Sequence, residues 1–198
     1  MEEIAVLGVG MHPWGKWGRN FVDYGVHAAQ KALDDAKVAW GDVGFVSGAV
    51  TVRCGYPGYV AGSTFARALG FTGAQVASSY SACASGVTAL SVARGQILSG
   101  ACDVALVVGA DTTPKGFLAP TGGDRPHDTD WLRFHLVGAT NPVYFALHAR
   151  RRMALYGATR EDFALVKAKN SRHGVHNPNA RYPKEYGVDD VASSPVVS

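Results

Sequence analysis

The sequence predicts a layered α/β fold, with helices on both faces of a parallel sheet. Four short apolar runs alternate with three segments of helical periodicity between residues 4 and 109. The runs are apolar nearly throughout, as expected of strands that are covered on both sides. Glycines stand at the ends of several of these segments, where a chain with short connections needs tight turns.

The predicted elements follow one another closely. Strands are expected at residues 4–10, 45–52, 75–79 and 102–109. The first helix is expected at residues 21–38, where apolar side chains three and four positions apart form one stripe. Two more helices are expected at residues 58–69, closed by Gly70, and at residues 87–98, ended near Gly100.

The character of the chain changes after Pro114. Residues 115–142 are rich in Gly, Pro, Asp and His and show no clear period, so they are expected to be irregular. A helix is expected at residues 143–156. Thr159 is typical of an N-cap for the helix after that, with Asp162 as an acidic variant of the capping box. Residues 177–198 are turn-rich.

Composition indicates a globular protein with a large core, because 47% of the 198 residues are hydrophobic and 18% are charged. No apolar run approaches the roughly 20 residues of a membrane span. The start of the chain lacks a basic segment and a cleavage site, so a cytoplasmic location is expected. The three cysteines are far apart, which argues for reduced thiols rather than a disulfide framework or a zinc site.

Positive charge is concentrated in one segment. Residues 150–184 hold nine Lys and Arg against two acidic residues, although the net charge of the whole chain is only +3. Such a field favours an anionic ligand, and a phosphate-bearing cofactor fits a globular enzyme better than nucleic acid does. The alternative is that these residues form an ordinary solvated helix face.

Cys83 lies in the stretch SSYSACASGV, where a predicted strand passes into a predicted helix. Unpaired N–H groups and the positive end of the helix dipole at that place stabilise a thiolate and could hold an oxyanion. The small neighbours leave room for a substrate carbonyl, and Gly86 could permit a strained turn. The alternative is a buried core cysteine, which is the expected role of Cys102. Cys54 lies in a loop and stays undecided.

Other catalytic and binding motifs are weaker. The serines around Cys83 lack the flanking glycines of a serine-hydrolase turn. The histidines and aspartates of residues 124–135 match no strong metal template, so no metal is expected. No GxGxxG sequence opens a helix after the first predicted strand, so a dinucleotide fingerprint is absent.

Four stretches carry a family resemblance. Residues 82–111, ACASGVTALSVARGQILSGACDVALVVGAD, are similar to the segment around the nucleophilic cysteine of the thiolase superfamily. Residues 130–163, DWLRFHLVGATNPVYFALHARRRMALYGATREDF, together with AKNSRHGVHNPNARY and SSPVVS, resemble the lipid-transfer-protein thiolases, also called sterol carrier protein x thiolases. The resemblance extends over essentially the whole chain.

The resemblance implies a fold and a site. Residues 1–113 would form the N-terminal αβ core of a thiolase half, and residues 114–198 the inserted loop domain that helps to bind coenzyme A. Cys83 would be the residue that the substrate acylates. Coenzyme A or acyl-CoA would be a substrate, with no permanently bound cofactor. The basic residues expected on the coenzyme A side are His148, Arg150, Arg151, Arg152 and Arg172.

The chain departs from the thiolase pattern in two respects. Many relatives place an asparagine just before the cysteine, whereas Tyr80, Ser81 and Ala82 stand here. Complete thiolases are also about twice this length, and their second αβ half supplies catalytic His and Cys residues in later motifs. Those motifs, and the strand that completes the first half after the loop domain, are not in this sequence, so the chain alone is not expected to run a full catalytic cycle.

Three hypotheses follow. The first is a thiolase-type acyltransferase acting on 3-oxoacyl-CoA with a branched or sterol side chain. The second is a thiolase-like aldolase that cleaves a steroid side-chain 3-hydroxyacyl-CoA together with a small OB-fold partner protein and needs no acylated cysteine. The third is an incomplete half that binds acyl-CoA or dimerises without catalysis. A homodimer or larger oligomer is expected, assembled through the strand near residues 75–79.

Overall fold

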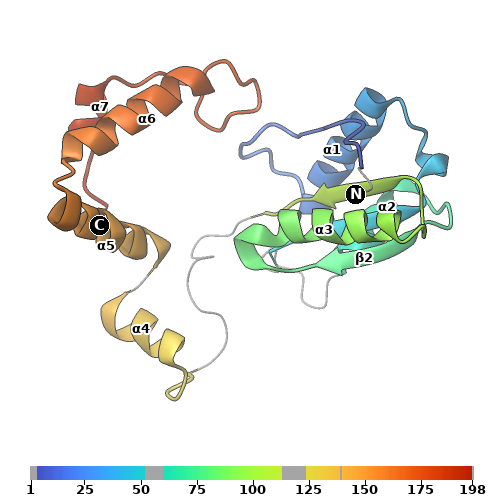
Figure 1. Ribbon diagram of the computed structural model, residues 1–198, viewed down its shortest axis with the longest axis horizontal. Helices are drawn as coiled ribbons and strands as arrows, with labels where there is room; N and C mark the ends of the chain where they lie inside the picture. The colour runs from blue at the N-terminus through green and yellow to red at the C-terminus, as the bar shows by residue number, and fades with distance from the viewer. Residues whose placement is uncertain (1–3, 52–59, 113–123, 139, 198) are drawn as a thin grey trace. The chain divides into compact units, whose positions relative to one another are not determined.

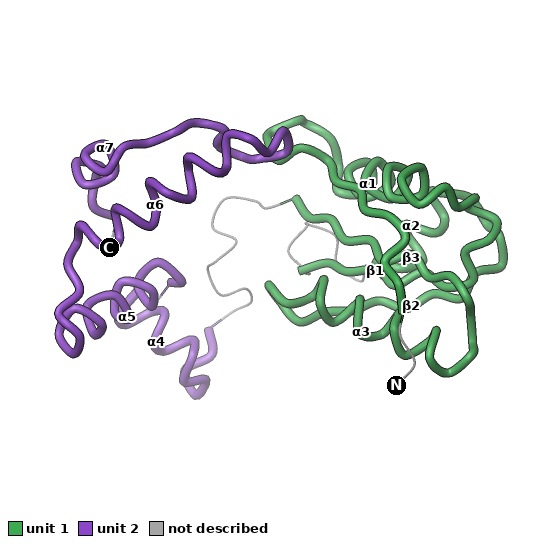
Figure 2. Tube along the Cα trace, turned by 45° about the horizontal axis from the view of Figure 1, so that its top comes forward, with its two compact units in different colours: residues 1–115 green, residues 116–198 purple. Residues whose placement is uncertain are grey.

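The computed structural model describes residues 4–51, 60–112, 124–138 and 140–197. The chain divides into two compact units, Met1–Lys115 and Gly116–Ser198 (Figure 2). The first unit holds the sheet, and the second is helical in its described residues.

Unit 1 is built on a parallel sheet in the order β2-β1-β3. Its strands are β1 (Phe45–Ala49), β2 (Gln75–Ser79) and β3 (Ala105–Gly109), and Phe45 stands opposite both Gln75 and Ala105. The helices are α1 (Phe21–Ala36), α2 (Ala61–Leu69) and α3 (Ser85–Leu98), with a 3-10 turn at Trp40–Asp42. Both connections between successive strands contain a helix, as parallel pairing requires.

The helices cover both faces of the sheet, which confirms the predicted layered α/β class (Figure 1). Neighbouring residues of a strand point to opposite faces. In β1, the buried Ser47 hydroxyl donates to the Ala89 carbonyl of α3 at 2.8 Å, whereas Gly48 lies against the backbone of α2. α3 therefore lies on one face, and α2 lies on the other.

The core of unit 1 lies between β1 and the helices α1 and α2. All five residues of β1 are buried. Phe65 of α2 and Phe21 of α1 are almost fully enclosed and pack edge to face, with ring centroids 6.1 Å apart. Gly62 brings α2 against the backbone of Ala77 in β2. The close approach at Gly48 and Gly62 sets the separation of helix and sheet.

The first predicted strand is wrong, because residues 4–10 are extended but pair with none of the described strands. They lie along α1 instead, where Gly8 and Gly10 contact the helix backbone and the Val9 N–H donates to the Asp35 carboxylate at 2.9 Å. A groove of about 220 Å³ separates this segment from β3. The apolar pattern indicated an extended segment correctly, but it carries no information about hydrogen-bonding partners.

Other predicted boundaries shift by a few residues. β3 begins at Ala105, so the predicted strand at 102–109 starts three residues too early. β1 ends at Ala49 rather than at residue 52, and α3 begins at Ser85, two residues before its predicted start. α1 ends at Ala36 because Lys37 takes a left-handed conformation with φ of 56° and closes the helix.

Unit 2 is helical in its described residues, with α4 (Thr129–Val137), α5 (Asn141–Tyr156), α6 (Arg160–Gly174) and α7 (Val188–Ala192). α4 and α7 fall in stretches that were expected to be irregular. Asp128 caps α4 by accepting from the N–H groups of Asp130 and Trp131. The mixed composition of that stretch gave no clear helical period, so the helix was not predicted. The capping box of Thr159 and Asp162 at the start of α6 is confirmed.

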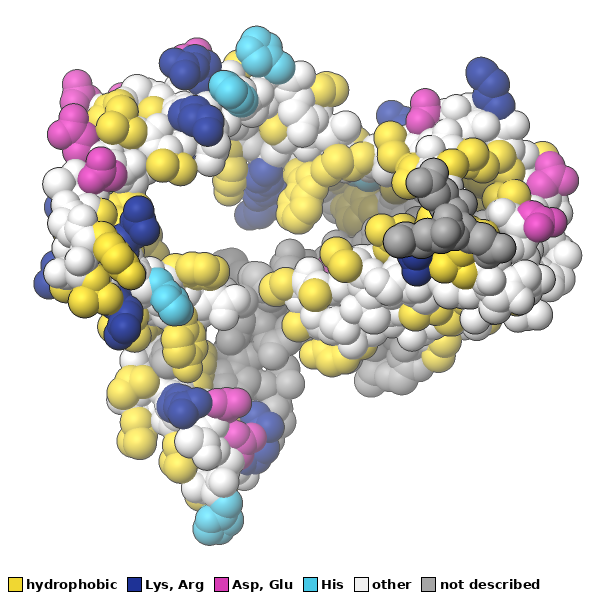
Figure 3. Space-filling model, in the orientation of Figure 1, with side chains coloured by type: hydrophobic (Ala, Val, Ile, Leu, Met, Phe, Trp, Pro, Cys, Tyr) yellow, Lys and Arg dark blue, Asp and Glu magenta, His cyan; other side chains and the backbone are white. Residues whose placement is uncertain are grey.

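Apolar side chains remain on the surface of unit 2. Phe145, Leu147 and Tyr156 of α5 are 61–74% exposed, and among the described residues of this unit only Ala164 and Ser171 are buried. Figure 3 shows such apolar side chains exposed over these helices. The Ser171 hydroxyl of α6 accepts a hydrogen bond from the Tyr186 N–H at 3.0 Å. This bond holds the chain that follows α6 against that helix. No helix among the described residues is long and apolar enough to cross a membrane.

Candidate functional site

The carboxyl ends of the three strands meet at one edge of the sheet. The parallel register places Ala49, Ser79 and Gly109 side by side at these ends. In open α/β sheets this edge is where ligands bind, because loops and helix N-termini gather there. The segments that follow β2 and β3 carry Cys83 and Asp111, so both chemical groups belong to this edge.

Cys83 lies in a 3-10 turn, Ala82–Ala84, that joins β2 to α3. Its free thiol is exposed, so the buried-core alternative is wrong for this residue. α3 begins two residues later, and its first N–H groups have no partner within the helix. The thiol is therefore accessible next to the positive end of a 14-residue helix.

Backbone strain lies at Ala82, immediately before the cysteine, where φ is 47°. A residue with a Cβ rarely adopts this left-handed region, and doing so costs about 1–2 kcal/mol. Gly86 was expected to permit the strained turn, but it lies inside α3 with an ordinary φ and open space around it. Strain of this kind often accompanies a functional residue that a sharp turn holds out of the surrounding structure.

Hydroxyl groups hold the turn around Cys83. The buried Ser85 hydroxyl accepts from the Ser81 N–H at 2.9 Å and donates to the Ala82 carbonyl at 2.7 Å. Thr88 adds a hydrogen bond between its hydroxyl and that of Ser81, at 2.9 Å. Ser81 and Ser85 are thus engaged in structure, which leaves Cys83 as the accessible nucleophile of the turn. In the sequence, the spacing of Ser81, Ser85 and Thr88 around the predicted start of the helix could have indicated this hydrogen-bond network.

Cys102 is a useful contrast to Cys83. It is half-buried in the turn before β3 rather than in the strand, and burial together with neighbouring Asp103 raises the pKa of its thiol. Cys54 lies outside the described residues.

We expect iodoacetamide to alkylate Cys83 several-fold faster than Cys102 in the native chain at pH 7.5. The thiolate is the reactive form, and Cys83 is both more accessible and free of the neighbouring carboxylate. Peptide mass spectrometry after timed quenching measures both rates, and alkylation of the unfolded chain gives the reference. Equal rates in the native chain would contradict an activated thiol at Cys83.

Asp111 links the ends of two strands. Its carboxylate accepts from the Thr51 backbone N–H, with nitrogen–oxygen distances of 3.0 and 3.2 Å to its two oxygens. Burial raises the pKa of Asp111, and hydrogen bonds from Thr51 offset part of that rise. The residue therefore fixes the position of the chain after β1 relative to the chain after β3. Sequence reasoning missed it, because a single acid after a strand has no distinctive spacing.

The raised pKa of Asp111 predicts a pH dependence of stability. A carboxyl whose pKa is higher in the folded state stabilises the fold below its unfolded pKa, and this contribution is lost as pH rises through the folded pKa. Asp111→Asn keeps an oxygen for the Thr51 N–H and removes the titration. As pH rises from 3.5 to 7, the wild type should lose this contribution and the variant should not. We therefore expect the unfolding free energy of the variant, measured with urea, to increase relative to that of the wild type over this range. A difference in unfolding free energy that is constant with pH would contradict this role.

The five basic residues expected on the coenzyme A side are all exposed or half-exposed, but they lie on two helices. His148, Arg151 and Arg152 share one face of α5, because they are three and four positions apart. Arg150 is on the other side of α5, and Arg172 belongs to α6. Within unit 2, Arg152 alone of the five lines a hollow at the corner between α5 and α6.

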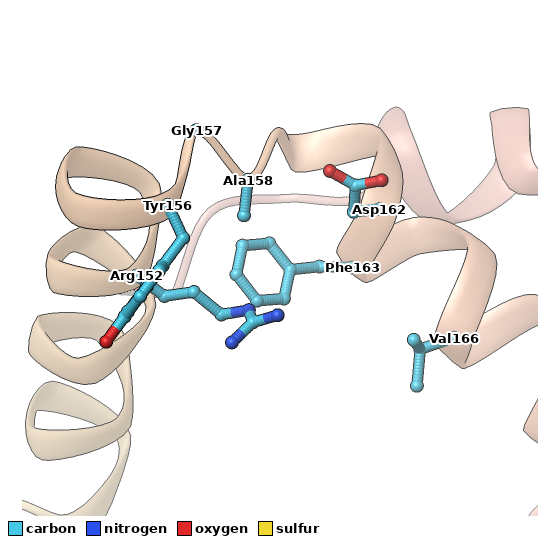
Figure 4. Close-up of a pocket in the computed structure, with 7 residues that line it drawn as sticks. All are labelled: Arg152, Tyr156, Gly157, Ala158, Asp162, Phe163 and Val166. Atoms are coloured by element: carbon cyan, nitrogen blue, oxygen red, sulfur yellow. The ribbon is translucent and has the colours of Figure 1, made fainter.

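This hollow has a volume of about 340 Å³ (Figure 4). The Arg152 guanidinium extends into it beside the Phe163 ring and stacks over Tyr156, at 5.7 Å from that ring's centroid. Asp162 stands at the rim, where it is engaged by Thr159 of the capping box. The hollow thus combines one guanidinium with two aromatic rings, a combination that suits a phosphate and a flat ring.

Other cations of the basic segment stack on tyrosines. Lys167 and Lys184 lie over the Tyr186 ring at 5.4 and 5.1 Å from its centroid, and Arg181 lies over Tyr182 at 5.4 Å. Part of the charge concentration therefore has a structural role. Across the described segments, no group of three or more His, Cys, Asp or Glu side chains could hold a metal ion.

Comparison with known proteins identifies the family. The model of the thiolase N-terminal domain matches residues 5–186, which is most of the chain. The chain belongs to the thiolase family. This thiolase chain accordingly has the parallel sheet and covering helices that its sequence predicted.

Individual relatives point to the same family. The chain is 32% identical to sterol carrier protein 2 of Bos taurus over 212 residues, covering 98% of this chain and 37% of that protein. It is 30% identical to the benzoylsuccinyl-CoA thiolase subunit BbsB of Thauera aromatica, covering all of this chain and 50% of that subunit. The chain thus spans between about a third and a half of the curated relatives it matches.

Among solved structures, the Ltp2-ChsH2(DUF35) aldolase resembles this thiolase chain with a TM-score of 0.73 and 23% identity. The match covers 98% of this chain and 49% of the other. It shows a shared fold.

Proposed function

We propose that this chain is the nucleophile-bearing half of a thiolase-type acyltransferase that acts on 3-oxoacyl-CoA. The observation that carries the proposal is the exposed Cys83 thiol in the strained turn between β2 and α3. Membership of the thiolase family and the likeness to a CoA thiolase subunit support an acyl-CoA substrate. A branched or sterol-side-chain acyl group is the substrate class, in keeping with the identity to sterol carrier protein 2.

In the proposed reaction, the Cys83 thiolate attacks the 3-oxo carbon of the substrate. The bond between C2 and C3 breaks, the acyl group stays on the sulfur as a thioester, and the shortened acyl-CoA leaves as a carbanion that takes up a proton. The thiol of a second coenzyme A then attacks the thioester, which releases a new acyl-CoA and restores the Cys83 thiolate. No oxidant or reductant is needed.

The residues around Cys83 suit the first step. The Ser85 N–H donates to the Ala82 carbonyl, so the N–H groups of the next positions of α3 are the ones proposed to stabilise the oxyanion that forms at the attacked carbonyl. Small side chains at Ala82 and Ala84 leave the sulfur open to a bulky acyl group. The proton transfers require groups that the described site does not offer, so the proposal assigns them to a second thiolase half.

Unit 2 supplies the coenzyme A side in this proposal. Arg152 with Tyr156 and Phe163 forms the hollow that best suits a phosphate and a flat ring. His148 and Arg151 extend the same face of α5. Arg150 and Arg172 lie elsewhere on unit 2 and are proposed to contribute only to its positive field.

Product analysis of the enzyme that combines this chain with a second thiolase half tests the proposed reaction. A 3-oxoacyl-CoA is mixed with free coenzyme A, and acyl-CoA products are followed by liquid chromatography and mass spectrometry. Thiolysis consumes one coenzyme A and yields two acyl-CoA molecules from each substrate. Formation of two acyl-CoA products supports the proposal, and an unchanged 3-oxoacyl-CoA contradicts it.

A thiolase-like aldolase is the second candidate, because the chain shares its fold over nearly its whole length with the Ltp2-ChsH2(DUF35) aldolase. Here a 3-hydroxyacyl-CoA of a steroid side chain is cleaved into an acyl-CoA and an aldehyde or ketone, with an OB-fold protein as partner. Coenzyme A is not consumed and Cys83 is not acylated. Carbonyl product formed at an unchanged rate by the Cys83→Ala variant would select this candidate over thiolysis.

We also propose that the chain dimerises through β2. This strand is at an edge of the sheet, and Val76 in its middle is 43% exposed. The backbone groups of a strand edge are a ready template for pairing with a second copy. Light scattering should give a dimer for the wild type and a monomer for Val76→Lys. The matched control Val196→Lys, at an exposed valine of unit 2, should stay dimeric. A monomeric wild type would contradict the proposal.

A further inference from the structure

A cluster of rings joins the loop before α1 to the first turns of that helix. The His12 ring lies at the centre, with its centroid 4.8 Å from Tyr24, 4.9 Å from His27 and 5.7 Å from Trp17. Tyr24 and His27 are three residues apart and share one face of α1. The reaction proposed for Cys83 assigns no role to these residues.

The loop that carries His12 and Trp17 is held in place by its own hydrogen bonds. The Trp17 indole donates to the Pro13 carbonyl at 2.9 Å, and the Tyr24 hydroxyl accepts from the Arg19 N–H at 3.0 Å. Gly15 lies against the Trp17 ring so closely that a side chain would displace it. The rings are therefore pre-positioned, which lowers the entropy that a ligand must offset on binding.

Positive groups gather around His27. Its pKa is lowered by burial first, and then by the nearby charges of Lys31, His12 and Arg19. Lys31 comes from the same face of α1, one turn beyond His27, and Arg19 comes from the preceding loop. These groups repel one another in the free protein. An anion bound among them would remove that repulsion and would gain charge-assisted hydrogen bonds.

The cluster lies at the ligand-binding side of the sheet. α1 leads into β1, so its first turns point toward the carboxyl edge and its last turns toward the opposite edge. Figure 1 shows the loop before α1 projecting at this end of unit 1. Trp17 is 55% exposed and neighbouring Trp14 is 65% exposed, so aromatic faces are available beside the cations.

We propose that the His12–Trp17–Tyr24–His27 cluster, with Arg19 and Lys31, is a binding site for an anionic ligand that carries a flat ring, of the nucleoside diphosphate class. The phosphates lie among the imidazoles, the guanidinium and the ammonium group. The ring of the ligand stacks on the exposed indole of Trp17. This cluster belongs to unit 1, whereas the hollow at Arg152 belongs to unit 2.

Binding at this site is coupled to proton uptake. A bound phosphate favours the imidazolium form of His27, so the pKa of His27 rises from its lowered value when the ligand binds. The positive groups that act on His27 are His12 and Arg19 from the loop and Lys31 from α1. Asp23, one turn before His27, is an acidic residue on the same face of α1. Affinity therefore falls as pH rises, by up to about tenfold per pH unit for one proton.

The test is a titration of the 198-residue chain with adenosine 5′-diphosphate at pH 6, followed by the NMR signals of the histidine ring protons. We expect saturable shifts of the His12 and His27 signals. Pyrophosphate should bind more weakly because it lacks the ring, and adenosine more weakly because it lacks the charge. At pH 8 the affinity for the diphosphate should fall at least several-fold.

Three variants separate this site from the one in unit 2. His27→Gln and His12→Gln should each weaken binding about tenfold, the usual effect of losing one charge-assisted hydrogen bond. Arg152→Gln should leave the His12 and His27 shifts unchanged, whether or not unit 2 binds coenzyme A. Absence of shifts at millimolar diphosphate, wild-type affinity in the two histidine variants, or equal affinity for pyrophosphate would overturn the proposal.

Discussion

Replacement of Cys83 by alanine is expected to abolish thiolysis in the enzyme that combines this chain with a second thiolase half. Loss of a nucleophile typically lowers kcat by roughly 10⁴–10⁶. The N–H groups of α3 and the coenzyme A side proposed in unit 2 would remain, so KM should change little. Steady-state rates with a 3-oxoacyl-CoA and free coenzyme A measure the effect.

Cys102→Ala is the matched control for that variant. It removes a half-buried thiol in the turn before β3, away from the proposed site, and the rate should stay within about twofold of the wild type. Thiolysis by Cys83→Ala at a rate near that of the wild type would show that Cys83 is not the nucleophile.

The second large effect concerns the packing of α2 on the sheet. Gly62→Ala places a methyl group where the Ala77 carbonyl oxygen of β2 now lies, and Gly48 of β1 also lies against Gly62. The obstacles are backbone atoms rather than flexible side chains, so α2 must move away from the sheet. We expect a loss of about 1–3 kcal/mol or more in the free energy of unfolding, measured with urea.

Gly95→Ala is the matched control for this packing argument. Gly95 lies inside α3, and no atom beyond its own helical turn lies within 4 Å of the position that an alanine Cβ would take. The substitution should stabilise the chain by about 0.5–1 kcal/mol, because glycine loses more backbone entropy than alanine on helix formation. Equal effects of the two substitutions would contradict the close approach at Gly62.

Much of the fold could be predicted from the sequence. The apolar runs that became β1, β2 and β3 are paired in one parallel sheet, and the helical stripes lie where the periodicity placed them. Residues 4–10 show the limit of sequence patterns. Their pattern is that of a buried strand, but pairing depends on which backbone lies alongside, and here α1 occupies one side while a groove occupies the other.

The candidate site was predictable only in part. The position of Cys83 at a strand-to-helix turn followed from local pattern, and the structure adds the strained φ of Ala82 and the hydrogen bonds of Ser85. These features depend on exact backbone angles that composition does not specify. The ring cluster around His12 was also invisible, because it joins a loop to a helix face across 15 residues of sequence.

Acylation of Cys83 is the most direct measurement of the central claim. The 198-residue chain is incubated with acetyl-CoA, digested under acidic conditions and examined by peptide mass spectrometry. Transfer of the acetyl group from coenzyme A to the Cys83 thiolate should give a hydroxylamine-sensitive thioester on the peptide that contains Cys83. An unmodified Cys83, or an adduct that persists in the Cys83→Ala variant, would contradict its role as the acyl-carrying nucleophile.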